Sequence, residues 1–174
     1  MNNETIEEYH PDFITITCYK WIHILNKDAN KEIITNSLSF LVQAKRIEVY
    51  AFVIMNNHFH LIWQIQKGNK REDVQRDFLK FTSQQLLNRI KKENSILLKE
   101  LLVNLKDRKY QVWQRNSLSI ELRSEQVYQQ KLNYIHNNPV KAGLCELPEE
   151  YKYSSAKFYE LNINDWNFLS NASG

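Results

Sequence analysis

Glycine, proline and cysteine are scarce in this chain of 174 residues, which holds three glycines, three prolines and two cysteines. So little glycine and proline excludes long linkers and low-complexity tracts, and favours long regular elements with short connections. The two cysteines, Cys18 and Cys145, lie far apart without CxxC spacing, which argues against a zinc ribbon or a disulfide framework and favours a reducing compartment. No run approaches the roughly 18 apolar residues of a membrane span, and residues 1–13 are polar and acidic. We therefore expect a cytoplasmic protein that neither enters a membrane nor carries a signal peptide.

An excess of one charge sign is also missing, because 23 basic residues face 20 acidic ones and the net charge is only +3. This balance is too mild to indicate a nucleic-acid-binding protein by itself. The distribution is more informative, since residues 67–92 form a basic run that includes Arg76 and Lys80. Such a run is either a solvated helix face or a path for phosphates, and charge alone does not separate the two.

The first half of the chain alternates between strand and helix patterns. Residues 13–21 are β-branched and alternating, which predicts a first strand. Asp28 is expected to cap a helix whose apolar positions recur every three or four residues. Residues 47–55 and 58–65 read as two strands joined by a tight turn at Asn56 and Asn57, which predicts a hairpin.

The second half begins with a basic amphipathic helix after Gly68. Residues 94–109 are ambiguous, with further helix as one possibility. Residues 111–122 predict a fourth strand, and Ser124 is expected to cap a helix that Pro139 ends.

This order, β-α-β-β-α-β-α, predicts an α+β fold of the ferredoxin-like, split βαβ type. We expect an antiparallel sheet with helices on one face, an added C-terminal helix, and the other face free for a ligand. The length fits a single domain over residues 1–174, with a core at residues 10–145 and a C-terminal extension at residues 146–174 packing on it.

Two histidines one residue apart, His58 and His60, lie in the otherwise apolar third strand. Side chains alternate along a strand, so both imidazoles project from one face while Phe59 points into the core. Two neighbouring imidazoles can offer ring nitrogens to one divalent cation. The other interpretation is a pair of surface histidines at a hairpin end, and spacing does not decide between them.

The predicted C-terminal helix carries a second constellation, because Tyr134 and Asn138 are four residues apart and share a helix face with Lys131 nearby. Asn138 precedes a proline, so this shared face is only approximate. Tyr134 packed under the sheet and Asn138 capping the helix are the structural alternative. His136 should point away from the Tyr134 face, in a packing or a DNA-contacting role.

Four motifs in a fixed order resemble the HUH single-tyrosine transposases, and most closely the REP-associated tyrosine transposases. They are MNNHFHLIW (55–63), VWQRN (112–116), YIHNNPVKAGL (134–144) and YKYSSAKFY (151–159). Family members usually have proline at the position of Asn56, a difference that affects the turn and leaves both histidines in place.

The resemblance implies a nuclease and transposase activity on single-stranded DNA through a 5′-phosphotyrosine intermediate, at hairpin elements of the REP kind. Carried over by residue, it implies Tyr134 as the nucleophile and His58, His60 and Asn138 as ligands of Mg²⁺ or Mn²⁺. Because a tyrosine pKa is about 10, the phenol needs a nearby cation, and we expect the metal and Lys131 to lower that pKa.

The resemblance implies that the partner is single-stranded or hairpin DNA. It also implies that the chain is a monomer or a homodimer. Lys131, Arg76, Lys80 and Arg115 are the candidate DNA contacts. The alternative function is a non-catalytic module that binds a DNA or RNA hairpin on an RRM-like sheet, although the aromatic RRM signature is absent. Zinc deaminases and two-histidine phosphoesterases are disfavoured because their motifs are missing.

Overall fold

The computed structural model describes residues 10–171, so residues 1–9 and 172–174 of the predicted domain lie outside the described residues. Its regular elements, in chain order, are β1 (Asp12–Thr17), η1 (Tyr19–Trp21), α1 (Asp28–Gln43), β2 (Ile47–Ile54), β3 (His58–Ile65), α2 (Arg71–Glu93), α3 (Ser95–Glu100), β4 (Leu102–Leu105), β5 (Arg108–Tyr110), β6 (Leu118–Glu121), α4 (Glu125–Lys141), η2 (Pro148–Glu150) and α5 (Ala156–Leu161). Among these helices, none is both long and apolar enough to cross a lipid bilayer.

A four-stranded sheet with the order β2-β3-β1-β6 forms the centre of the molecule, and every neighbouring pair is antiparallel. Strand β3 lies between β1 and β2, so α1 connects two strands that are not adjacent. This is the split βαβ arrangement. The predicted fold class is therefore confirmed, as is the hairpin of β2 and β3 around Asn56 and Asn57.

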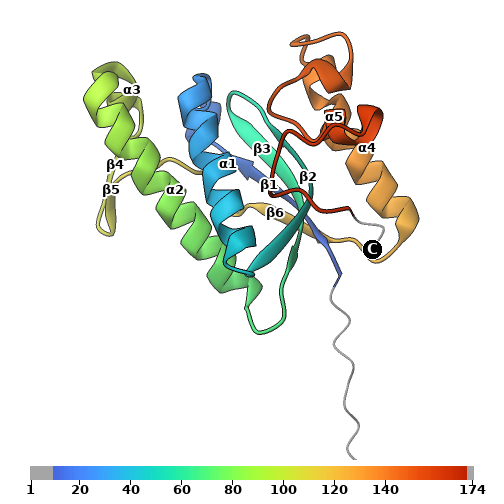
Figure 1. Cartoon of the computed structure of the whole chain (residues 1–174). Helices are drawn as coiled ribbons and strands as arrows, with labels where there is room; N and C mark the ends of the chain where they lie inside the picture. The colour runs from blue at the N-terminus through green and yellow to red at the C-terminus, as the bar shows by residue number, and fades with distance from the viewer. Residues whose placement is uncertain (1–9, 172–174) are drawn as a thin grey trace, which may run out of the picture.

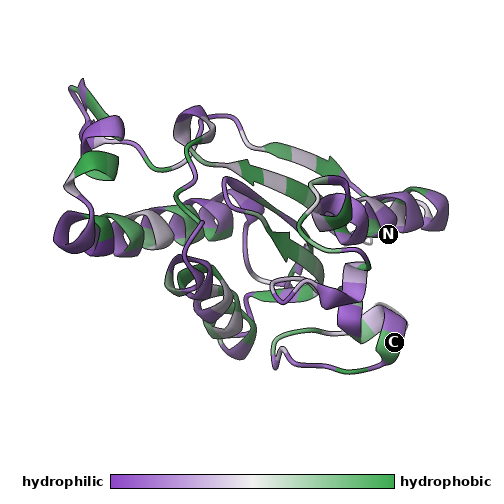
Figure 2. Cartoon of the chain, turned by 90° about the horizontal axis from the view of Figure 1, so that it is seen from above, coloured by the Kyte–Doolittle hydropathy of each residue, from purple (hydrophilic) through white to green (hydrophobic). Residues whose placement is uncertain are grey.

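The two faces of the sheet bury separate cores. Helices α1 and α2 pack on one face through Ile34, Leu38 and Phe78, against sheet residues such as Phe59. Helix α4 packs on the other face through a group made up of Tyr128, Leu132 and Ile135. Figure 1 shows α4 across the sheet from α1 and α2, and Figure 2 shows mostly hydrophobic strands in the sheet and helices with both hydrophilic and hydrophobic residues. The face expected to be free is thus partly covered by the added helix.

The C-terminal segment hydrogen-bonds along the outer edge of β2. The backbone N–H of Ile54 donates to Tyr153 O at 2.9 Å, and the N–H of Ser170 donates to Val49 O at 2.9 Å. Phe52 and Phe168 add a ring contact with centroids 5.4 Å apart. An uncovered edge strand invites association with other strands, so this segment protects the sheet edge opposite β6.

Two predicted boundaries near the N-terminus are wrong. The strand expected over residues 13–21 ends at Thr17, because the backbone turns into η1 with Lys20 and Trp21 at positive φ. Asp28 does not cap α1: it is the first helical residue, Lys27 occupies the N-cap position without a side-chain bond, and Asp28 accepts a hydrogen bond from Nζ of Lys152. Asp28 still places negative charge in the first helical turn, where the helix dipole favours it.

The strand expected over residues 111–122 is shorter than predicted, because only Leu118–Glu121 pairs with β1. Trp113 makes an isolated bridge to Cys18 instead. The ambiguous residues 94–109 form the short helix α3 followed by the two-stranded hairpin β4-β5. This hairpin pairs with itself and not with the main sheet.

Helix α4 continues past Pro139, where the sequence predicted its end. Pro139 lies in the last turn, and the helix ends at Lys141. Gly143 then adopts φ +69, and the N–H of Leu144 donates to Pro139 O at 2.9 Å. A left-handed glycine after the last turn is a common way to end a helix. Because the helix is intact at Asn138, this residue keeps its position one turn beyond Tyr134.

Candidate active site

His58 and His60 project side by side from β3 towards the face that α4 partly covers. Their ring centroids are 4.9 Å apart. Phe59 between them is fully buried in the opposite core, as the strand period predicts. His58 is half-buried, whereas His60 is only 3% exposed.

Each imidazole is oriented by a hydrogen bond at Nδ1. Nδ1 of His60 lies 2.8 Å from Oγ1 of Thr15, its cross-strand partner on β1. Nδ1 of His58 lies 2.7 Å from Oδ1 of Asn57, and because that amide oxygen only accepts, the ring donates from Nδ1. A neutral imidazole that donates from Nδ1 keeps a lone pair on Nε2, the arrangement typical of metal-binding histidines.

Burial favours the neutral form of both rings. Burial is the main cause that lowers the pKa of His60 to about 3, with smaller contributions from the nearby charges of His58 and Lys131. Burial also lowers the pKa of His58, although a hydrogen bond with Asn138 opposes this effect. At neutral pH Nε2 of each ring is therefore unprotonated and able to bind a cation.

Helix α4 places Tyr134 and Asn138 against this pair. Nδ2 of Asn138 lies 3.2 Å from Nε2 of His60. The ring of Tyr134 is 5.1 Å from that of His60, centroid to centroid, at an interplanar angle of 73°. Tyr134 is 43% exposed, so its ring reaches solvent rather than packing under the sheet. Residues from β3 and α4, more than 70 positions apart in the sequence, thus meet at one place.

Two lysines surround Tyr134. Nζ of Lys131 lies 5.8 Å from the centroid of the Tyr134 ring and 4.8 Å from that of Phe13. Nζ of Lys141 lies 5.9 Å from the Tyr134 ring. Positive charge on both sides of an exposed phenol makes this end of the molecule attractive to a phosphate.

The donor set fits one divalent cation. His58 and His60 offer Nε2 lone pairs, and Asn138 offers a carbonyl oxygen once its terminal amide turns to exchange its nitrogen and oxygen. Among residues 10–171, no group of three or more histidine, cysteine or acidic side chains could hold a metal. A third protein ligand beside the two imidazoles would therefore have to be of another kind, such as the amide of Asn138. Three uncharged ligands would leave the full charge of a bound ion to act on a phosphate, and would leave positions open for the phosphate oxygens.

The other predicted DNA contacts do not all lie beside the pair. Arg76 and Lys80 are exposed on α2, across the sheet from α4, and Arg76 makes ion pairs with Asp73 and Asp77. Arg115 is exposed in the segment before β6, next to Gln114, whose backbone N–H donates to Thr17 O at the end of β1 near His58. Their roles stay predictions.

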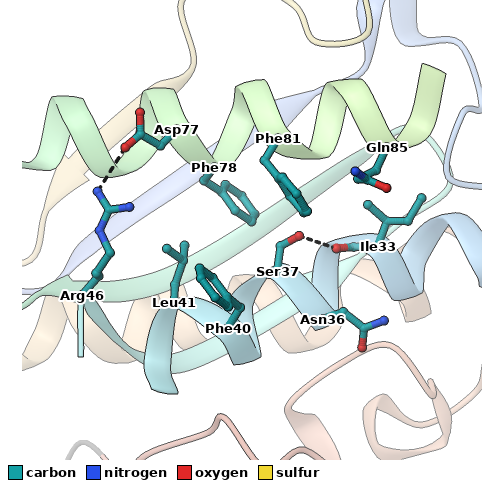
Figure 3. Close-up of a pocket in the computed structure, with 10 residues that line it drawn as sticks. All are labelled: Ile33, Asn36, Ser37, Phe40, Leu41, Arg46, Asp77, Phe78, Phe81 and Gln85. Atoms are coloured by element: carbon teal, nitrogen blue, oxygen red, sulfur yellow. Dashed lines mark hydrogen bonds and ion pairs between the residues drawn. The ribbon is translucent and has the colours of Figure 1, made fainter. Parts of the chain in front are cut away.

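An apolar groove of about 470 Å³ lies between α1 and α2. Figure 3 shows Phe40, Phe78 and Phe81 pointing into it, with the Arg46–Asp77 ion pair at one end. This groove is across the sheet from the histidine pair and holds no titratable group beyond that ion pair. It is therefore not the candidate active site.

Sequence reasoning missed three residues that shape the site. Asn57 and Thr15 orient the imidazoles, and Lys141 is two turns beyond Tyr134 on α4. Helical spacing could have indicated Lys141, whereas Thr15 depends on the register between β1 and β3. His136 packs away from the site, 4% exposed, with Nε2 2.9 Å from Oγ of Ser155.

No known family model matches the chain. A curated protein of Haemophilus influenzae with the provisional name REP-associated tyrosine transposase is 26% identical over 157 residues, covering 86% of this chain and 85% of that protein. The solved structure of a REP-associated tyrosine transposase bound to a REP hairpin has a TM-score of 0.65 at 16% identity, covering 99% of this chain and 94% of that one. A provisional transposase from Deinococcus radiodurans has a TM-score of 0.47 at 15% identity, over 79% of this chain and 97% of that one. The curated relative confirms the resemblance that the four motifs indicate over 86% of this chain. The transposase structure with the REP hairpin shows that the fold is shared.

Proposed function

We propose that this chain is a REP-associated tyrosine transposase that acts in the cytoplasm, cleaving and rejoining single-stranded DNA through a 5′-phosphotyrosine intermediate. The observation that carries the proposal is the exposed phenol of Tyr134 beside two neutral, pre-oriented imidazoles and an asparagine amide. A nucleophile, a candidate ligand set and flanking cations together form the constellation expected for transfer of a phosphodiester.

Tyr134 is the attacking group in this mechanism. Its phenolic oxygen attacks the phosphorus of the scissile phosphodiester, and the bond to the 3′-oxygen breaks. The phenol proton passes to solvent, and the leaving 3′-oxygen takes up a proton from solvent. The products are a 5′-phosphotyrosine and a free 3′-hydroxyl. Because the phosphodiester energy is kept in the covalent link, another 3′-hydroxyl can reverse the step without a nucleotide cofactor.

His58, His60 and Asn138 would hold a divalent ion, Mg²⁺ or Mn²⁺. The chemistry that such an ion supplies is polarisation of the phosphate oxygens and stabilisation of the charge that develops on them. Thr15 and Asn57 support this role by keeping the Nε2 lone pairs directed into the site. Lys131 and Lys141 position the strand by attracting its phosphates beside Tyr134.

A hairpin in single-stranded DNA is the substrate that we propose, since the matching solved structure is of a transposase bound to a REP hairpin. The sheet and α4 meet at the histidine pair, where Tyr134 and Asn138 contact His60. Phosphates near this site would meet Lys131 and Lys141, so recognition of the strand starts from charge.

The test is covalent capture on a denaturing gel. The probe is a single-stranded DNA hairpin with random flanks, labelled at its 3′ end, because the fragment downstream of the cut stays on the tyrosine. With Mn²⁺ or Mg²⁺ we expect label on the protein band, and we expect it to disappear in Tyr134→Phe and His58→Ala. Tyr110→Phe is the matched control, since Tyr110 lies on the separate β4-β5 hairpin.

Two results would contradict the proposal. Label that persists in Tyr134→Phe would assign the nucleophile to another tyrosine. Tight binding of the hairpin without any adduct, with both metals, would instead indicate the non-catalytic binding module.

A further inference from the structure

Trp21 is an exposed tryptophan next to the histidine pair. Its side chain is 61% exposed, whereas Trp63 and Trp113 are buried in the core. Its ring centroid lies 5.9 Å from that of His58, at an interplanar angle of 70°. The contacts from Trp21 to His58, from His58 to His60 and from His60 to Tyr134 form a continuous row of rings. Core packing does not account for an indole at the open end of this row.

The backbone that holds Trp21 is strained. Lys20 and Trp21 adopt φ +51 and +58, two consecutive non-glycine residues in the left-handed region. Residues other than glycine rarely adopt this conformation. It persists only where the surroundings enforce it, most often at functional sites. Glycine or asparagine would fill these positions at lower cost.

Anchors on both sides enforce this conformation. The N–H of Cys18 donates to Asn57 O at 2.8 Å, and the N–H of Tyr19 donates to Val112 O at 2.7 Å. On the other side, the N–H of Leu25 donates to Asn56 O at 2.9 Å. The buried ammonium of Lys31 ties this region together by donating to the Leu25 carbonyl and to Oδ1 of Asn56. The loop that displays the indole is thus fastened to the turn that precedes His58.

We propose that Trp21 is a stacking platform for one unpaired base of the DNA strand, the base immediately 5′ of the cleaved phosphodiester. This inference rests on the proposed function. An aromatic ring held rigidly in solvent suits base stacking, because every base has a flat apolar face. Tyr134 lies at one end of the row of rings and Trp21 at the other. Attacking and leaving oxygens lie roughly in line in phosphoryl transfer, so the nucleotide that keeps the 3′-oxygen is on the Trp21 side.

Binding is tested first, without chemistry. The Tyr134→Phe protein is titrated with a single-stranded oligothymidylate, and tryptophan fluorescence and anisotropy of a labelled strand are recorded. We expect quenching of tryptophan emission that disappears in Trp21→Phe, while affinity is largely kept because phenylalanine still stacks. Trp21→Ala should weaken binding by roughly 5- to 150-fold, the range for loss of one stacked base. The matched control is Phe81→Ala, which removes an aromatic ring that is 52% exposed across the sheet.

Position is tested with the cleavage substrate. Its cut site is located from the length of the released strand, and single abasic nucleotides are then placed on either side of it. In the wild-type protein, the abasic nucleotide immediately 5′ of the cut should slow adduct formation about as much as Trp21→Ala does. In Trp21→Ala the same abasic nucleotide should cause no further loss.

The outcomes separate this inference from the proposed function. If Trp21→Ala binds DNA with unchanged affinity and forms the adduct at the wild-type rate at subsaturating DNA, the stacking role is overturned. The transposase proposal is then intact. If the wild-type protein forms no adduct but its fluorescence quenching depends on Trp21, the proposed DNA cleavage is refuted and base stacking on Trp21 is supported. An abasic effect that is strongest elsewhere and persists in Trp21→Ala overturns the assigned position.

Discussion

Nδ1 of His60 lies 2.8 Å from Oγ1 of Thr15, so a hydroxyl on β1 orients a candidate metal ligand on β3. The two residues are direct partners across the antiparallel ladder. A hydrogen bond at the second ring nitrogen fixes the tautomer and the ring orientation of a metal-binding histidine.

Replacing Thr15 with valine keeps the shape of the side chain and removes the hydroxyl. We expect Mn²⁺ affinity, measured by titration calorimetry, to fall by about 10- to 100-fold, the range for loss of such a partner. Thr35→Val is the control, because the Thr35 hydroxyl bonds only within α1, to Glu32 O. Equal Mn²⁺ affinity in the two variants would show that Thr15 does not orient a ligand.

Asn138→Ala should weaken Mn²⁺ binding by at least about tenfold, because it removes one of three proposed ligands. Asn138→Asp should retain binding, since a carboxylate is also an oxygen ligand for this ion. The neighbouring Asn137→Ala, which loses only a bond to Asn133 O on its own helix, should bind like the wild type. If Asn138→Ala binds Mn²⁺ as tightly as the wild type does, Asn138 is not a metal ligand.

The stability of the metal-free protein should depend on acid through its buried histidines. Burial lowers the pKa of His136 to about 4, while an unfolded histidine titrates near 6.5. Between these values the unfolded chain binds the proton and the folded one does not, so stability falls as pH drops through this window and is constant above it. His60, with a pKa of about 3, acts in the same direction.

We expect His136 alone to account for about 2 kcal/mol of lost unfolding free energy at pH 5 relative to pH 7.5. Urea denaturation in EDTA at the two pH values measures this loss. His136→Gln should reduce it by that amount, whereas His23→Gln, at an exposed position, should not. A loss that is identical in all three proteins would assign the acid sensitivity to other groups.

Lys131→Met should lower the affinity for single-stranded DNA and flatten its dependence on salt. Each phosphate contact contributes a slope of about 0.7 in a plot of log affinity against log salt concentration for a single strand. Fluorescence anisotropy over a salt series gives the slope directly. Lys45→Met, on the exposed loop after α1, is the control of equal charge, and matching slopes would show that Lys131 does not face a phosphate.

Trp21→Gly should stabilise the fold slightly or leave it unchanged, because glycine relieves the left-handed strain at φ +58. The indole is mostly exposed, so little buried surface is lost. Urea denaturation compares this variant with Ile22→Gly, at φ −62. That variant should be destabilised by more than about 1 kcal/mol, because glycine relieves no strain there and the packing of Ile22 against the core is lost. Marked destabilisation of Trp21→Gly would mean that the indole is there to support the loop.

The periodicity of the chain was sufficient for most of the fold. Alternation placed β2 and β3 almost to the residue and put His58 and His60 on one face, because burial on either side of a sheet imposes a period of two. It failed over residues 111–122, where Trp113 turns towards Thr82 and Leu79 of α2 in place of extending a strand. It also failed at Pro139, where α4 continues to Lys141 although proline has no N–H to donate to the carbonyl four residues earlier. Pro139 is buried, and the packing of α4 on the sheet holds the helix there.

The sequence by itself determined which groups are present and which of them share a strand or a helix face, since both properties depend on local repeats of two and 3.6 residues. Tertiary structure alone decided that β3 and α4 meet, that Thr15 orients His60, and that Trp21 stands beside His58. These contacts depend on strand register and on helix-to-sheet packing between segments distant in the chain. The local repeats of the sequence carry no information about these long-range contacts.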